Sequence, residues 1–93
     1  MKAYKTAPYD EATARRLTDG SIKGFISTRS GNTVRLLCHD AKGDYPLTGL
    51  VDVGSCEVPM QWSSIGNYTV GRYARPHRND LVLHVAEEGG DGV

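Results

Sequence analysis

The sequence predicts a small, mainly β domain in which one short N-terminal helix precedes a curled antiparallel sheet. Three observations predict this class. Between residues 22 and 62, apolar and polar residues alternate in short runs that are separated by glycine-containing turns. Residues 32–53 hold the two most hydrophobic runs, joined by a polar connection with Gly43 and Pro46. Residues 10–20 carry the signals of a helix, and 93 residues suffice for one domain with a modest core.

The helix is expected over residues 10–20. Asp10 is suited to cap the free amides of the first turn, and Gly20 is suited to the left-handed conformation that ends a helix. A helix this short is not stable alone in water, so it must pack on the sheet. Ala14 and Leu17 are the apolar residues that would make this contact.

Five strands are expected after the helix, and a sixth short one is possible over residues 68–72. The expected ranges are 22–27, 33–39, 47–53, 56–62 and 81–85. Pro59 cannot donate a ladder hydrogen bond, which places its strand at an edge or at a bulge. One core is expected to bury a residue from each strand, namely Ile26, Leu36, Val51, Met60 and Leu83.

Short strands at close spacing favour a sheet that curls into a small barrel. An SH3-like barrel is the first expectation, a flatter meander with the helix on one face is the second, and an oligonucleotide-binding barrel is the third. The expected organisation is a flexible lead-in over residues 1–8, a single domain over residues 9–85, and a disordered acidic tail over residues 86–93.

Charge and composition narrow the function classes. Eleven basic residues balance eleven acidic ones, which argues against a dedicated nucleic-acid binder. The charge is uneven, however, because residues 1–37 hold seven Lys or Arg against three Asp or Glu. No stretch approaches the roughly 20 apolar residues of a membrane span, and the N-terminus lacks the apolar run of a secretory signal. We therefore expect a cytoplasmic protein with no membrane partner.

Several short motifs resemble a group of short, uncharacterised proteins from phages and prophage-like regions of bacterial genomes. They lie within residues 8–85 and are Thr28-Arg29 with Gly31, Val34-Arg-Leu-Leu-Cys38, Asp40-Ala-Lys-Gly-Asp-Tyr-Pro46, Leu50-Val51, Gly66-Asn-Tyr68 and Asp80-Leu81. The resemblance implies a small β-domain and brings no activity with it. The chain departs from the group between Arg72 and Arg78, where the group tends to be acidic.

Metal or thiol chemistry is not indicated. The available ligands lack zinc spacing, and they are Cys38, His39, Cys56, His77 and His84. Cys38 and His39 are neighbours on a strand, so their side chains point to opposite faces and cannot form a nucleophile–base pair. We expect Cys38 and Cys56 to be unbridged, buried and free of metal.

Catalysis by carboxylates or with a cofactor is not indicated either. The aspartates near the middle strands stand at turns, where they ordinarily bind backbone amides, and they are Asp40, Asp44 and Asp52. No phosphate-binding loop, dinucleotide fingerprint or nucleophile elbow is present. We expect a non-enzymatic protein with no catalytic residue and no cofactor.

The strongest functional signal is a short run of arginines, residues 72–78, here called the arginine segment. Its guanidinium groups are suited to bind carboxylates or phosphates, and its tyrosine is suited to stack. The candidate binding residues are Tyr68, Arg72, Tyr73, Arg75, His77 and Arg78. The first hypothesis is a binding module that docks on an acidic partner protein through this segment and nearby tyrosines. The alternative is a nucleic-acid-binding SH3-like domain that uses the same segment.

Overall fold

The computed structural model describes residues 4–69 and 76–86. In this part the chain forms one helix and a six-stranded antiparallel sheet, which confirms the mainly β class. The elements are β1 (Tyr4–Pro8), α1 (Glu11–Asp19), β2 (Gly24–Thr28), β3 (Thr33–Cys38), β4 (Leu47–Asp52), β5 (Glu57–Trp62) and β6 (Leu81–Ala86). No helix among the described residues is long and apolar enough to cross a membrane.

The sheet is open, so the expected SH3-like barrel is wrong. The strand order is β1-β6-β2-β3-β4-β5, and the two end strands, β1 and β5, do not pair with each other. The last strand lies between the first two, because β6 pairs with β1 on one side and with β2 on the other. The oligonucleotide-binding barrel fails for the same reason. The flatter meander with a helix on one face is closer, since β2 to β5 follow each other in order.

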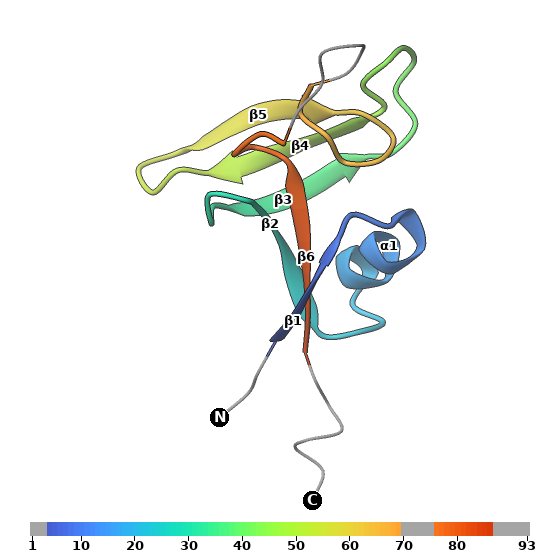
Figure 1. The fold of residues 1–93 in the computed structure, drawn as a ribbon, viewed down its shortest axis with the longest axis vertical. Helices are drawn as coiled ribbons and strands as arrows, with labels where there is room; N and C mark the ends of the chain where they lie inside the picture. The colour runs from blue at the N-terminus through green and yellow to red at the C-terminus, as the bar shows by residue number, and fades with distance from the viewer. Residues whose placement is uncertain (1–3, 70–75, 87–93) are drawn as a thin grey trace, which may run out of the picture.

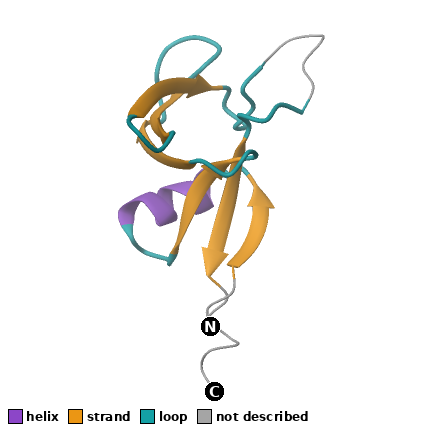
Figure 2. Ribbon diagram, turned by 90° about the vertical axis from the view of Figure 1, so that its left-hand side faces the viewer, coloured by secondary structure: helices purple, strands orange, loops and turns teal. Residues whose placement is uncertain are grey.

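The sheet bends sharply between β2 and β3 (Figures 1 and 2). These strands pair through only two residue pairs, Ile26 with Val34 and Ser27 with Thr33. Beyond these pairs the two strands diverge. Strands β1, β6 and β2 form one half of the sheet, and β3, β4 and β5 form the other half, which lies across the first (Figure 1). A register shift between Leu36 and Cys38 bends β3 further, because a bulge adds local twist.

Helix α1 begins and ends as the sequence predicts. Asp10 is its N-cap, and its carboxylate accepts hydrogen bonds from the Thr13 amide at 2.9 Å and the Thr13 hydroxyl at 2.7 Å. Gly20 ends the helix with a φ of 85°. Ala14 is fully buried and Leu17 packs against the core, so the predicted docking residues are confirmed.

The helix lies close to the half of the sheet made by β1, β6 and β2. Gly24 makes this approach possible, because a Cβ at that position would collide with the His84 carbonyl and lie 2.8 Å from a methyl of Leu17. Its φ of 149° is also one that residues with a side chain rarely adopt.

The Asp10 cap predicts a pH dependence. The hydrogen bonds from Thr13 hold the pKa of Asp10 below its usual value of 3.8. Because the pKa of Asp10 is lower in the folded protein, the cap stabilises the fold at pH values above the usual pKa. This stabilisation is lost as the pH falls through the folded-state pKa. Asn caps about as well as Asp but does not titrate. We therefore expect Asp10→Asn to match the wild type near neutral pH and to lose less stability between about pH 5 and pH 2.

Urea unfolding of both proteins at a series of pH values measures this difference. All other carboxylates are common to the two proteins, so the gap between the two curves isolates Asp10. If the unfolding free energies of the two proteins stay parallel over the whole acid range, protonation of Asp10 is not linked to folding.

The core is one cluster that joins both halves of the sheet and the helix. Four of the five predicted core residues are buried, and Met60 is partly buried against the cluster. The buried members are Ala14, Ile26, Val34, Leu36, Leu47, Val51, Trp62, Leu81 and Leu83. At Gly49 the backbones of β3 and β4 approach so closely that an added Cβ would meet the Arg35 carbonyl at 2.5 Å.

The N-terminal stretch differs from the expectation. Residues 4–8 were expected to lie in a flexible lead-in, but they form β1 and pair with β6 from Tyr4↔Ala86 to Pro8↔Val82. Ala86, expected to begin the disordered tail, is the last residue of β6, whereas residues 87–93 lie outside the described residues. The possible strand over residues 68–72 is not seen at Tyr68 and Thr69, and its remaining residues are not described.

Candidate functional site

The arginine segment belongs to the connection between β5 and β6. The structure describes three of the six candidate binding residues, namely Tyr68, His77 and Arg78. Arg72, Tyr73 and Arg75 lie outside the described residues. The described part of the connection is its base, where the chain leaves the sheet after β5 and returns to it before β6.

Tyr68 and His77, nine positions apart, lie together at this base. Their rings stack with centroids 4.7 Å apart and planes 25° apart. Asp80 holds them in place: its Oδ1 accepts a hydrogen bond from the Tyr68 amide at 2.8 Å, and its Oδ2 accepts one from the His77 amide at 2.9 Å. The Asp80 amide in turn donates to the His77 carbonyl at 2.9 Å. One buried carboxylate, only 8% exposed, thus fixes both ends of the connection.

The base is also tied to the core. The indole Nε1 of Trp62, a fully buried residue at the end of β5, donates to the Asn79 carbonyl at 2.7 Å. The Leu81 amide donates to the Gly66 carbonyl at 2.9 Å, which joins the start of β6 to the turn over residues 63–67. This turn ties the base of the connection to the start of β6.

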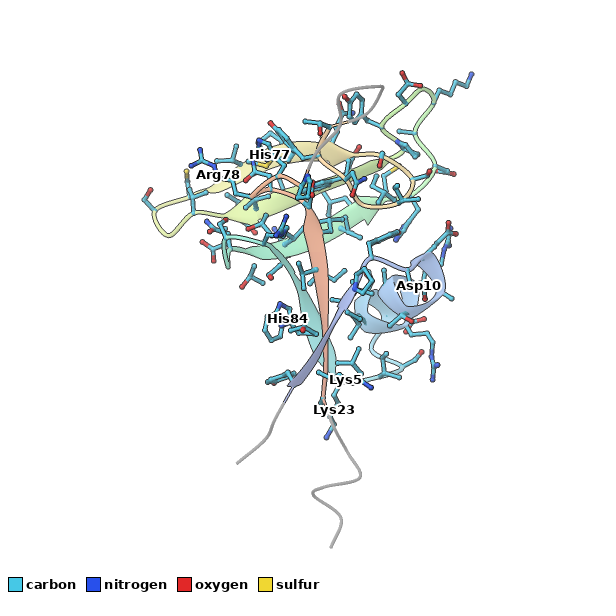
Figure 3. All side chains as sticks on the ribbon, viewed as in Figure 1. Lys5, Asp10, Lys23, His77, Arg78 and His84 are labelled. Atoms are coloured by element: carbon cyan, nitrogen blue, oxygen red, sulfur yellow. The ribbon has the colours of Figure 1, made fainter. Side chains whose placement is uncertain are left out.

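Arg78 is exposed, and its backbone is fixed. Its carbonyl accepts a hydrogen bond from the Ser30 amide at 3.0 Å, while the neighbouring Arg29 amide donates to the Asp80 carbonyl at 2.9 Å. Figure 3 shows His77 and Arg78 in the half of the molecule that holds β3, β4 and β5, away from α1. Neither ion pair within the described residues involves Arg78; the two pairs are Glu11–Arg15 and Arg35–Glu57. Among the described residues its guanidinium has no acidic partner, so its charge is suited to bind a carboxylate or phosphate.

A groove of about 610 Å³ opens beside this base. Tyr68 and Thr69 form one part of its lining, Tyr45 in the β3–β4 connection forms another, and strands β4 and β5 supply the rest. The lining residues are Tyr45, Thr48, Pro59, Met60, Gln61, Tyr68 and Thr69. None of them is charged. The volume is in the usual range for a binding site, and the lining combines apolar surface with a few polar groups.

The sequence predicted only one residue of this groove, Tyr68. Tyr45 lies 23 positions earlier in the chain, and its place beside Tyr68 follows from the curl of β3, β4 and β5. Two signals were available in the sequence: the Tyr45-Pro46 pair in a turn, and a proline in a strand that must then lie at an edge.

The cysteines follow the expectation in part. Both are free, so the prediction that they are unbridged is confirmed. Cys38 is half-buried, and its thiol lies 3.2 Å from the Asp40 carboxylate. Cys56 is exposed, so its expected burial is wrong, because β5 begins at Glu57 and leaves Cys56 in the preceding turn. Among residues 4–69 and 76–86, no three Cys, His, Asp or Glu side chains gather as metal ligands would.

The closest approach to a catalytic arrangement is Ser27 with His84. The Ser27 hydroxyl lies 2.8 Å from His84 Nε2, but it also donates to the Thr28 carbonyl at 2.9 Å. The single hydroxyl proton can serve only one of these two acceptors. Ser27 is buried, and His84 stacks on Phe25 with centroids 4.3 Å apart. This pair supports the sheet on the face opposite α1 (Figure 3) and offers no accessible nucleophile.

The site therefore consists of an uncharged tyrosine-lined groove, an exposed arginine and a rigid base that joins them. No family model matches this chain, and no curated protein or solved structure is significantly similar to it. The function proposed for this site therefore rests on the chemistry of its own residues.

Proposed function

We propose that this protein is a small, non-enzymatic docking module of the phage or prophage type, acting in the cytoplasm. It binds a segment of a partner protein in the groove beside Tyr68. The arginine segment contacts acidic residues of the same partner. The observation that carries the proposal is the fixed pairing of Tyr68 with His77 at the edge of this groove.

Rigidity at the base favours recognition. A connection between two strands needs only a few small residues, yet this one places two rings, a buried carboxylate and an arginine at its ends. Pro76 restricts its own backbone dihedral just before His77. Groups that are already ordered lose less entropy when a partner binds. Tyrosine and arginine are also the residues that contribute most often to the energetic centre of protein interfaces.

The uncharged groove favours a protein partner over nucleic acid. A phosphate backbone is bound mainly by Lys and Arg, and none of the described residues that line the groove is charged. The alternative remains that the arginine segment binds nucleic acid without the groove. That mode would weaken steeply with salt and would compete with bulk DNA, whereas a tyrosine-centred protein contact depends less on salt.

Replacing Arg72, Arg75 and Arg78 together by Ala tests the proposal. Arg78 is exposed, and arginines in connections usually contribute little to stability, so we expect the melting temperature to stay nearly unchanged. We expect capture of the partner from a bacterial host lysate to fall at least tenfold, since several interface arginines are lost at once. Quantitative mass spectrometry of the captured proteins measures the fall, with and without nuclease.

The matched control is replacement of Arg15, Arg16 and Lys23 by Ala. This variant loses the same charge from the other end of the molecule and is expected to capture the partner normally. Equal capture by all three proteins would place the binding site elsewhere, and capture that disappears with nuclease would favour the nucleic-acid alternative.

A further inference from the structure

We infer that the groove between Tyr45 and Tyr68 takes a proline-rich segment of the partner in the polyproline II conformation. This inference rests on the proposed function and names the class of segment that the groove binds. Three properties of the described residues lead to it: the edge strand beside the groove, the polar groups in its lining and its lack of charge.

The edge strand β5 is poorly suited to bind an added β-strand. The Val53 amide donates to the Cys56 carbonyl at 3.0 Å, which makes this facing pair a hydrogen-bonded one. Hydrogen-bonded and non-bonded pairs alternate along an antiparallel ladder, so the pair Leu50↔Pro59, three steps further, is non-bonded. The backbone of Pro59 therefore faces outward from the edge.

A proline at an outward position interrupts the row of amides that an added strand would need. Proline has no amide hydrogen, and edge prolines of this kind prevent pairing with other strands. Pro59 stands in the middle of β5, between Glu57 and Gln61, the neighbouring outward positions. Strand β5 therefore offers outward amides at Glu57 and Gln61 with a gap between them, which disfavours a continuous ladder with a partner strand.

The groove supplies what a polyproline II segment requires. Such a segment has no internal hydrogen bonds, and its prolines offer carbonyl acceptors but no amide donors. The lining offers hydroxyl and amide donors from Tyr45, Thr48, Gln61, Tyr68 and Thr69. Within the described residues, the polar side-chain atoms of these five residues make no hydrogen bond to the protein. With no side-chain partner among the described residues, these groups are suited to donate to the carbonyls of the bound segment.

The remaining lining is suited to pyrrolidine rings. The rings of Tyr45 and Tyr68, with Met60 and Pro59, give an apolar surface flanked by donors. Aromatic grooves of this composition bind proline-rich segments because the polyproline II helix is already ordered and little entropy is lost. Arg78, which follows His77 at the base of the connection, is suited to pair with an acidic residue that flanks the prolines. An extended acidic strand would find the row of edge amides interrupted at Pro59 and would meet no charged residue among the described residues that line the groove.

Titration with an oligoproline peptide of about ten residues tests the inference, followed by two-dimensional NMR of the labelled protein. We expect the signals of Tyr45, Met60, Gln61 and Tyr68 to shift, with weak affinity in the micromolar to millimolar range, as is usual for a short peptide. Tyr45→Ala and Tyr68→Ala should each lower the affinity about tenfold. Tyr45→Phe should lower it less, because it keeps the ring and loses only the hydroxyl.

Two controls make the result specific. Ile65→Ala alters an exposed apolar residue outside the groove and should bind normally. A peptide of equal length that alternates Thr and Val, and so favours strands, should leave the groove signals unchanged. If this peptide binds and oligoproline does not, the inference is wrong.

The inference and the proposed function can fail separately. If oligoproline causes no shifts but Tyr68→Ala still loses the partner captured from lysate, the docking function stands and the polyproline II segment is excluded. If oligoproline binds and Tyr68→Ala captures that partner as well as the wild type, the groove binds proline-rich segments but docking on this partner uses another surface. If neither effect is seen, both proposals fall.

Discussion

Replacing Trp62 by Ala is expected to destabilise this protein more than most other single core truncations. The side chain is fully buried at the end of β5, and truncating a buried tryptophan costs about 3–5 kcal/mol. The indole also donates to the Asn79 carbonyl, so the variant leaves that acceptor without its partner. A small domain has only about 5–15 kcal/mol of stability, and we expect the melting temperature to fall by roughly 12 °C or more.

Two companion variants separate the causes. Trp62→Phe keeps most of the apolar volume but loses the hydrogen bond, and it should lie between the wild type and Trp62→Ala. Ile65→Ala, three residues away, truncates a side chain that is 66% exposed and should change stability by less than about 0.5 kcal/mol. Trp62 is the only tryptophan in the chain, so its fluorescence follows unfolding in the wild type directly. A wild-type emission already typical of water would contradict its burial.

Trp62 also shows what could be predicted from the sequence. It stands at the end of an alternating run, and the alternation identified its strand and its inward face. Helix α1 could also be predicted from the sequence, because Asp10 and Gly20 act on backbone groups a few residues away. Local signals of this kind do not depend on how distant strands pair.

The errors concern pairing over long sequence distances. Strand β1 carries Lys5 and Thr6 and has little periodicity, and it becomes a strand because β6, some 80 positions later, supplies its hydrogen bonds. The open sheet has the same origin, since β6 lies between β1 and β2 and leaves β1 and β5 as free edges. The prediction that Cys56 is buried was wrong for a simpler reason. The turn before β5 continues one residue further than the alternation suggested.

The same difference between local signals and long-range structure holds for the candidate site. The arginines and tyrosines of residues 68–78 identified the connection as unusual, and Tyr68 does line the groove. In the sequence, Asp80 stands out only as part of the Asp80-Leu81 motif. Its hydrogen bonds to the Tyr68 and His77 amides depend on the path of the backbone, which composition does not reveal.

Asp80→Ala is expected to have the second large effect, on stability and on binding together. The variant leaves the amides of Tyr68 and His77 without an acceptor, and each unsatisfied buried group costs about 1–3 kcal/mol. Asp80→Asn tests the same point with a side chain of the same shape. One of its two terminal atoms becomes a donor, so it must face an amide that also donates, and one of the two hydrogen bonds is lost.

Amide hydrogen exchange locates the effect. We expect either the Tyr68 or the His77 amide, whichever faces the donor end of the Asn side chain, to lose protection in Asp80→Asn before the amides of β2 and β6 do, because its hydrogen bond is lost while the sheet remains. Asp44→Ala, an exposed change in the β3–β4 connection, is the control and should leave exchange unaltered. If Asp80→Asn keeps full protection at Tyr68 and His77, the carboxylate does not hold the base of the connection. If protection is lost and partner capture falls with it, the fixed pairing of Tyr68 and His77 is what the docking surface requires.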